Sequence, residues 1–318
     1  MTAATEHTTR GALSHLAGDL ETARSEYDVA LASDPGNATA HNNLGFLLAQ
    51  EGRLDEAEAE LRTALEHDPG SSMAWLNLGN VLAARGDGTA ALDALRRAVA
   101  LDATNALSHD ALGRLLLAAG RVGEAERACR AAVEAAPDQP PLLATLAAVV
   151  GARGRMREAV GLLEQAVALD PESPPLWEQL GTARFARRDL GAAAEALHEA
   201  LARAPERGRA RHTLALVHLT AGEPGAAELE LDRFLAAHPD VEDVRLDRAT
   251  LRCAAGRFAE ALADIAAVAE TPRSRFARAV ALDGLGHRDE AVGLLEALRD
   301  DPSASGYAGR AAEVLDGV

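Results

Sequence analysis

Residues 72–105 read SMAWLNLGNVLAARGDGTAALDALRRAVALDATN, and this stretch decides the fold of the chain. Its first half places apolar or small residues at the i, i+3, i+4, i+7 spacing of one helical face: Trp75, Leu78, Gly79 and Leu82. Gly86-Asp87-Gly88 then interrupts the helix. A second apolar stripe follows at Ala91, Leu95 and Ala98. The stretch therefore predicts two helices joined by a tight turn.

The same pattern recurs every 34 residues. One series of small residues runs through Gly11, Gly45, Gly79, Gly113, Ala147, Gly181, Ala215 and Ala249. A second series marks the turn inside each unit: Gly18, Gly52, Gly86, Gly120, Gly154, Gly222 and Gly256, with Arg188 as the exception. Series that stay in register over eight units predict an all-helical repeat protein and leave little room for a second domain.

A 34-residue helix-turn-helix unit with Leu-Gly, Gly, Ala and Pro at fixed places resembles the tetratricopeptide repeat. The units begin near residues 4, 38, 72, 106, 140, 174, 208, 242 and 272. The resemblance implies an all-α, right-handed superhelical solenoid of about nine helix-turn-helix repeats, with the first helix of each repeat lining a concave groove. His41 and His109 occupy the place of Trp75, so we expect them to be packing residues.

The regularity changes near the C-terminus, where the unit that starts at 242 has only 30 residues. We expect the last pair of helices at 273–285 and 289–299. Ser303 is a candidate N-cap for a capping helix over 304–318, with Tyr307, Ala311 and Leu315 as its apolar stripe. The predicted solenoid thus covers 1–303.

The charge balance narrows the class of partner. The net charge is −17, and residues 1–71 alone carry thirteen carboxylates against four arginines. A nucleic-acid partner is therefore not expected, whereas the acidic stretch is either a solvated face or a docking surface for a basic partner. No apolar segment predicts a membrane span or a leader at Met1–Leu13, so we expect a cytoplasmic protein. All 32 cations are arginine, which indicates a bacterial source.

No motif predicts catalysis, a cofactor or a metal site. The phosphate-binding P-loop needs a lysine, which the chain lacks, and no nucleophile-elbow motif occurs. Cys129 is expected to be a packed thiol, and Cys253 a free thiol nearer the groove. We therefore expect that the chain is not an enzyme.

Arginines stand at places of the repeat that are usually apolar: Arg245, Arg248 and Arg252, and again Arg275 and Arg278. The seventh residue of a repeat lies nearly level with the twenty-third, which predicts that Arg248 pairs with Asp264. Arg278 is the competing partner for that carboxylate. A stripe that binds phosphate or nucleic acid is the alternative.

The groove supplies the candidate binding site. The residues there are polar on three successive repeats, with apolar neighbours: Asn42, Asn43, Asn77, Asn80, Arg114, Phe46 and Leu117. Amides that donate and accept suit the backbone of an extended peptide, and Arg114 suits a carboxylate. We expect these places to pack little, so that replacing Asn43 and Asn77 by alanine leaves the fold unaffected. Solvated groove residues without a ligand are the alternative.

The resemblance implies a protein–protein interaction scaffold that binds a peptide or a partner protein in the groove. Lysine-based recognition of carboxyl-terminal tails, which some of these domains use, is not expected in a chain without lysine. Two alternatives stay open: a substrate-holding or accessory subunit of a biosynthetic or modifying enzyme, and a peptide-sensing regulatory receptor. The oligomeric state is also open.

Overall fold

The computed structural model describes residues 2–316, without the side chains of Ser305 and Asp316, and over this range it contains helices and no strands. The all-α repeat architecture predicted from the sequence is confirmed. Residues 317 and 318 of the predicted cap, and Met1 of the predicted solenoid, lie outside the described residues. The chain divides into two compact units, residues 1–170 and residues 171–318.

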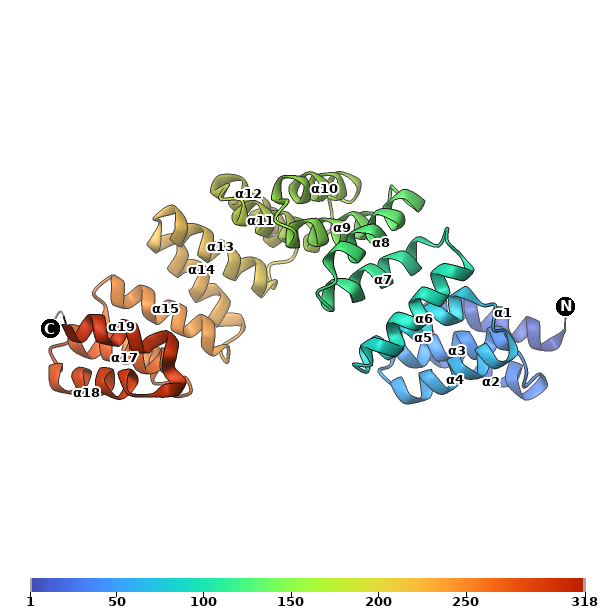
Figure 1. Ribbon diagram of the computed structural model, residues 1–318, viewed down its shortest axis with the longest axis horizontal. Helices are drawn as coiled ribbons and strands as arrows, with labels where there is room; N and C mark the ends of the chain where they lie inside the picture. Colours follow the sequence, from blue (N-terminus) through green and yellow to red (C-terminus); the bar gives the residue numbers. More distant parts are fainter. Residues whose placement is uncertain (1, 317–318) are drawn as a thin grey trace. The chain divides into compact units, whose positions relative to one another are not determined.

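The first unit consists of five helix pairs, coloured blue to green in Figure 1. Their helices are α1 (Ala3–Leu16), α2 (Leu20–Ser33), α3 (Ala38–Gln50), α4 (Leu54–His67), α5 (Ser72–Ala84), α6 (Gly88–Leu101), α7 (Ala106–Ala118), α8 (Val122–Ala135), α9 (Pro140–Ala152) and α10 (Met156–Leu169). Each helix packs against its own partner and against the next pair. This is the neighbour-only contact pattern of a solenoid.

The second unit consists of four helix pairs and a last helix (Figure 1). Its elements are α11 (Pro174–Ala186), α12 (Leu190–Arg203), α13 (Gly208–Ala221), α14 (Pro224–Ala237), α15 (Glu242–Ala254), α16 (Phe258–Ile265), α17 (Pro272–Gly284), α18 (Arg288–Arg299), the 3₁₀ turn η1 (Pro302–Ala304) and α19 (Ser305–Asp316). The pairs again contact their neighbours along the chain.

Small residues allow the two helices of a pair to approach closely. A Cβ atom added to Gly79 of α5 would lie 2.6 Å from Cγ of Leu95 in α6, and one added to Gly45 would lie 2.7 Å from Cγ of Leu61. Ala91 on the facing helix is fully buried. Glycine at these places therefore allows the two helices of a pair to contact each other, because a larger side chain would separate them.

The turn inside each pair needs a left-handed backbone. The seven turn glycines have φ between 71° and 87°, and Gly286 adds an eighth glycine turn at φ 84°. Arg188 adopts the same conformation with φ 66°, as the only non-glycine with positive φ among the described residues. Glycine reaches this region without steric cost, whereas an L-residue does not.

The eighth repeat is short because its second helix is short. α16 has eight residues, whereas the other second helices have twelve or fourteen. The next repeat then starts with a capping box, in which Thr271 and Ser274 each bond the other's backbone N–H, and Pro272 occupies the first turn. The predicted pair at 273–285 and 289–299 is observed as α17 and α18, each starting one residue earlier.

The last helix packs its apolar stripe on the ninth pair. Ala311 of α19 is fully buried in a cluster with Leu295 and Leu298, and Tyr307 packs against the same cluster. The expectation that Ser303 caps this helix is wrong. Its hydroxyl lies 2.6 Å from Oδ1 of Asp301, because Pro302 opens a 3₁₀ turn that holds Ser303 beside that carboxylate.

In six of the repeats the side chain of the fourth residue bonds the preceding turn. Nε1 of Trp75 donates to the carbonyl of Pro69 at 3.0 Å, and Nε1 of Trp177 does so to Pro171 at 2.8 Å. The ring nitrogen Nε2 of His109 lies 3.0 Å from the carbonyl of Ala103. His41, Arg211 and Arg245 contact the equivalent carbonyls, six residues upstream. The side chains at this place therefore anchor the first helix to the turn as well as packing.

Candidate functional site

Three of the predicted groove residues form a chain of side-chain amides between α3 and α5. Nδ2 of Asn77 donates to Oδ1 of Asn42 at 3.0 Å, and Nδ2 of Asn42 donates to Oδ1 of Asn43 at 3.1 Å. Burial raises the pKa of the Tyr27 hydroxyl, and a hydrogen bond with Asn43 offsets part of that rise. These amides therefore satisfy one another between successive first helices.

This arrangement corrects one expectation. Asn77 is 8% exposed, so the idea that all the groove amides pack little is wrong for this residue. Replacing it removes a buried hydrogen bond and leaves Asn42 with an unpaired acceptor. Asn77 is buried because it contacts the neighbouring repeat: the sixth residue of one repeat bonds the fifth residue of the repeat before it. The residue pattern within a single repeat does not predict this contact.

A cavity of about 250 Å³ lies beside this chain of amides, on the face formed by the first helices. Phe46 and Gln50 line it from α3, Asn77 and Asn80 from α5, and Leu54 from the start of α4. Ala49, Val81 and Ala84 complete the wall. We call this space the α3–α5 cavity. It brings together three of the predicted site residues: Phe46, Asn77 and Asn80.

Of the three predicted residues that line the cavity, Phe46 and Asn80 are exposed. Phe46 is 44% exposed, and its ring lies 5.4 Å from the ring of His15, centroid to centroid. Nε2 of that histidine is 2.7 Å from Oε1 of Gln50. Asn80 is exposed, and its side chain bonds no other described residue. An aromatic ring and a free amide thus flank the α3–α5 cavity.

The other two predicted residues lie on α7. Arg114 is exposed and forms an ion pair with Asp110, one turn earlier, with Nε and Oδ2 3.0 Å apart. Oδ1 of Asp110 is buried and has no hydrogen-bond partner among the described residues. Leu117 is half-buried and does not line the α3–α5 cavity. Arg114 is therefore a flanking cation, whereas Leu117 stands apart from the cavity.

Two exposed apolar side chains extend the first-helix face beyond the predicted set. Met73 of α5 is 43% exposed and Leu107 of α7 is 60% exposed, and both are the second residue of their repeat. Sδ of Met73 accepts a hydrogen bond from Nδ2 of Asn105 at 3.5 Å. Equivalent placement one repeat apart is the sequence signal that identifies them.

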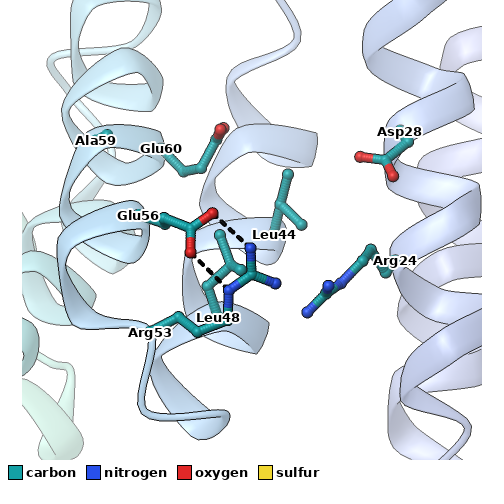
Figure 2. Close-up of a pocket in the computed structure, with 8 residues that line it drawn as sticks. All are labelled: Arg24, Asp28, Leu44, Leu48, Arg53, Glu56, Ala59 and Glu60. Atoms are coloured by element: carbon teal, nitrogen blue, oxygen red, sulfur yellow. Dashed lines mark hydrogen bonds and ion pairs between the residues drawn. The ribbon is translucent and has the colours of Figure 1, made fainter.

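A different hollow, of about 380 Å³, lies between the second helices α2 and α4. Figure 2 shows Leu44 and Leu48 of α3 at its floor, with Arg53 bonded to Glu56 on one side and Arg24 extending from α2 on the other. Nε of Arg53 lies 2.6 Å from Oε1 of Glu56. Because Arg24, Arg53, Glu56 and Glu60 already form ion pairs, this hollow is not the site we favour.

Ion pairs also join one repeat to the next, and the sequence reasoning missed them. Glu58 pairs with Arg85, and Glu126 pairs with Arg153, both 27 residues downstream. Arg155 and Arg130 also reach Glu126, at 2.7 and 3.0 Å. Hydrogen bonds from Arg155 above all, and then from Arg130 and Arg153, lower the pKa of Glu126 to about 2 against the effect of burial. The recurring spacing of 27 residues was the available signal.

The predicted pair in the arginine stripe is confirmed. Nε of Arg248 lies 3.0 Å from Oδ2 of Asp264, and a second nitrogen lies 2.5 Å from Oδ1. Arg252 reaches the same carboxylate at 2.9 Å, whereas Arg278 does not pair with it in the described part of the chain. The hydrogen bond with Asp264 is the main cause that raises the pKa of Arg248. Arg248 and Arg252 thus serve ion pairs inside the fold.

Both cysteines are buried and free, and burial disfavours the ionised form of each thiol. Burial raises the pKa of the Cys129 thiol to about 12, and it raises that of Cys253 as well. Within residues 2–316 no cluster of three or more histidine, cysteine, aspartate or glutamate side chains is arranged to hold a metal ion. No helix in that range is both long enough and apolar enough to span a bilayer.

Solved structures similar to this chain share its fold. A chain of the APC/C hetero-tetramer Cut9-Hcn1 matches with a TM-score of 0.60 and 21% identity, over 70% of this chain and 46% of that one. PilF of Pseudomonas aeruginosa matches with a TM-score of 0.57 and 20% identity, over 64% and 92%. A tetratricopeptide repeat protein of Parabacteroides merdae matches with 0.58 and 16%, over 76% and 96%. No curated protein matches the chain.

Models of protein families match almost the whole chain. Two tetratricopeptide repeat models match residues 212–275 and 272–297. The model described as Cilia and flagella-associated protein 70 C-terminal domain matches residues 2–215, which is more than half of the chain. Together with the helix pairs, the turn glycines and the close helix contacts, these matches identify the chain as a tetratricopeptide repeat protein that belongs to the family of the Cilia and flagella-associated protein 70 C-terminal domain.

Proposed function

We propose that this protein is a protein–protein interaction scaffold that holds an extended segment of a partner at the α3–α5 cavity. The observation that carries the proposal is the cavity itself, about 250 Å³ between two successive first helices. A concave space flanked by an exposed aromatic ring and an unpaired amide suits an apolar side chain together with its adjoining peptide bond.

Phe46 and Asn80 have different roles in this proposal. The ring of Phe46, with the neighbouring alanines, covers an apolar side chain of the partner. The amide of Asn80 donates to and accepts from the partner's backbone. Asn42, Asn43 and Asn77 position α5 against α3 through their mutual hydrogen bonds. Recognition of backbone and one side chain gives affinity with a loose sequence preference.

Arg114 sets the direction of the bound segment. Its exposed guanidinium lies one repeat beyond Asn80 at the equivalent place, and Asp110 holds it by one ion pair. We therefore expect an acidic group of the partner near α7. Met73 and Leu107 offer further apolar contacts along the same face.

The test starts with capture of partners from the source cell and continues with calorimetry on the purified pair. Phe46→Ala combined with Asn80→Ala should weaken binding about 10- to 30-fold, since a net hydrogen bond contributes about 1 kcal/mol and the lost ring contact adds to it. Leu101→Ala, which shortens an exposed apolar side chain on the second helix α6, is the matched control and should leave the affinity unchanged.

Undiminished affinity in the double variant, with an intact circular-dichroism spectrum, would reject the α3–α5 cavity. Strong weakening by added salt would then point to the acidic surface of residues 1–71 and a basic partner. We assign no reaction to the chain and propose a cytoplasmic, bacterial protein without a nucleic-acid or membrane partner. Two narrower roles fit the same site: a substrate-holding subunit of a modifying enzyme, and a peptide-sensing receptor.

A further inference from the structure

A second cavity, of about 400 Å³, lies in the C-terminal unit between α15, α17 and α19. Cys253 borders it from α15, Arg273, Phe276 and Val280 from α17, and Tyr307 and Arg310 from α19. We call it the α19 cavity. It shares no residue with the α3–α5 cavity, so a ligand of the α19 cavity is independent of the proposed function.

The wall of the α19 cavity is apolar. The rings of Phe276 and Tyr307 lie 5.7 Å apart, centroid to centroid, and are inclined by 45°. Ala277 and Cys253 are buried beside them. Thr250 also lines the cavity, but its hydroxyl already donates to the carbonyl of Leu246 at 2.8 Å. Apart from the Tyr307 hydroxyl, this part of the cavity therefore offers packing rather than hydrogen-bond donors.

Two arginines line the α19 cavity, and they differ in whether a carboxylate pairs with them. Arg273 is compensated, with one nitrogen 2.5 Å from Oδ1 of Asp247 and another 3.4 Å from Oδ1 of Asp243. The guanidinium carbon of Arg310 lies 5.9 Å from the centre of the Tyr307 ring, and Arg310 has no ion pair with a side chain that the structure describes. Arg310 thus places an unpaired positive charge at the edge of the apolar α19 cavity.

We propose that the α19 cavity binds a free carboxylic acid with an aliphatic or arylalkyl body, in its ionised form. The apolar body lies against Phe276, Val280 and Tyr307, and the carboxylate pairs with Arg310. Size and charge both support this class. The volume falls in the range of small-molecule sites, and a guanidinium matches a carboxylate with two parallel hydrogen bonds. An amine would meet like charge, and an uncharged body would leave the arginine unpaired.

Direct binding tests this assignment with matched probes on the full chain. Octanoate and 3-phenylpropionate should bind in calorimetry, whereas octylamine should not, and octanol should bind more weakly than octanoate. Thiol labelling gives a second readout. Octanoate should slow alkylation of Cys253 by N-ethylmaleimide, measured for each cysteine by peptide mass spectrometry. Cys129, which lies in the other unit and outside the α19 cavity, should be unaffected.

Two variants test separately the contribution of the Arg310 charge and that of the cavity volume. Arg310→Gln should weaken octanoate about 10-fold, because a hydrogen bond to a charged group is lost, and should leave octanol unchanged. Ala254→Leu fills the cavity from α15, where Ala254 is exposed and lines it, and should weaken both probes. Ala255→Leu, at the next residue and outside the lining, is the control and should bind both probes normally.

Three results would overturn the assignment. One is equal affinity for octanoate and octanol. Another is octanoate binding that Ala254→Leu leaves intact while thermal melts show that variant to be folded. The third is binding of a peptide with a carboxyl-terminal leucine, but not of its amide, in the absence of any binding by the free acids. That last result would assign the α19 cavity to a protein terminus.

Discussion

Asp264 shows at the scale of one residue how a carboxylate is kept inside an apolar repeat. It is 4% exposed and accepts hydrogen bonds from both Arg248 and Arg252. The two arginines have other partners as well: Asp232 lies 2.7 Å from Arg248, and Glu228 lies 2.9 Å from Arg252. The cluster therefore pairs every one of these charges, and Asp264 and the two arginines are the members with low exposure.

We predict that Asp264→Ala destabilises the protein more than Arg248→Leu. The first change leaves two partly buried guanidinium groups around an empty place and should cost about 3 kcal/mol, whereas the second leaves Asp264 paired with Arg252 and should cost about 1 kcal/mol. Thermal melts of the two variants measure the order. Asp232→Ala, at a carboxylate that is 45% exposed, should cost less than either. The reverse order would contradict the pairing and revive a ligand role for the stripe.

Arg188 gives a second prediction at this scale. Its left-handed φ of 66° is strained for an L-residue by about 1–2 kcal/mol, and glycine would remove that strain at a smaller cost in unfolded-state entropy. Arg188→Gly should therefore raise the free energy of unfolding by about 0.5–1 kcal/mol in urea titrations. The neighbouring Arg187 has φ −81°, so that Arg187→Gly should lower it. A loss in both variants would show that the Arg188 side chain stabilises the turn.

The residue scale also shows where reasoning from the sequence succeeds. The pairing of Arg248 with Asp264 could be predicted because both lie in one repeat, where the helix period fixes which residues are level. Asn77 could not be placed correctly, because its partner Asn42 belongs to the preceding repeat. The offset between the facing helices of successive repeats depends on how they pack, and the 34-residue period does not predict it.

At the scale of helices, ion pairs join one repeat to the next. Glu126 of α8 receives Arg153 and Arg155 from the next pair and Arg130 from its own helix. Its side chain is 9% exposed, so the screening that weakens surface pairs is reduced there. The contact ties the second helix of one repeat to the turn of the next.

This contact predicts a pH dependence. The folded-state pKa of Glu126, about 2, lies below its ordinary value near 4.5, so the stabilisation is present above the ordinary value and is lost as the pH falls through 2. Glu126→Gln should therefore be less stable than the parent at neutral pH, and the gap should narrow between about pH 5 and pH 2. Melting temperatures across this range measure it. Glu134→Gln, at an exposed carboxylate of the same helix, should follow the parent.

The start of each repeat could be predicted to within a residue of the observed first helix, and the last pair of helices to within a residue at each end. The exceptions have local causes. α16 has eight residues where the preceding second helix has fourteen, which shortens its unit, and a 3₁₀ turn at Pro302 displaces the start of the last helix. The identity of Asp301 as the acceptor for Ser303 depends on that turn, which the helical pattern did not predict.

At the scale of the whole molecule, an array of repeats is stabilised by its neighbours and needs a closed end. Deleting residues 304–318 should expose Leu295 and Leu298, which α19 covers. We expect hydrogen exchange within residues 272–299 to become at least about 10-fold faster, together with aggregation on warming. Ala311→Asp, at a fully buried place, should reproduce the effect, and Gly309→Asp, on the exposed side, should not. Unchanged protection in the truncated chain would mean that α19 is not a cap.

The bond from the fourth residue of a repeat to the turn before it shows which side chains that place can accept. Tryptophan, histidine and arginine differ in size, charge and hydropathy, yet each brings a nitrogen to the equivalent carbonyl. Leu143, at the same place of the fifth repeat, is buried and has no donor. A polar residue at the fourth place is therefore compatible with the repeat when its side chain can donate to that carbonyl, and an apolar residue is compatible when it is covered.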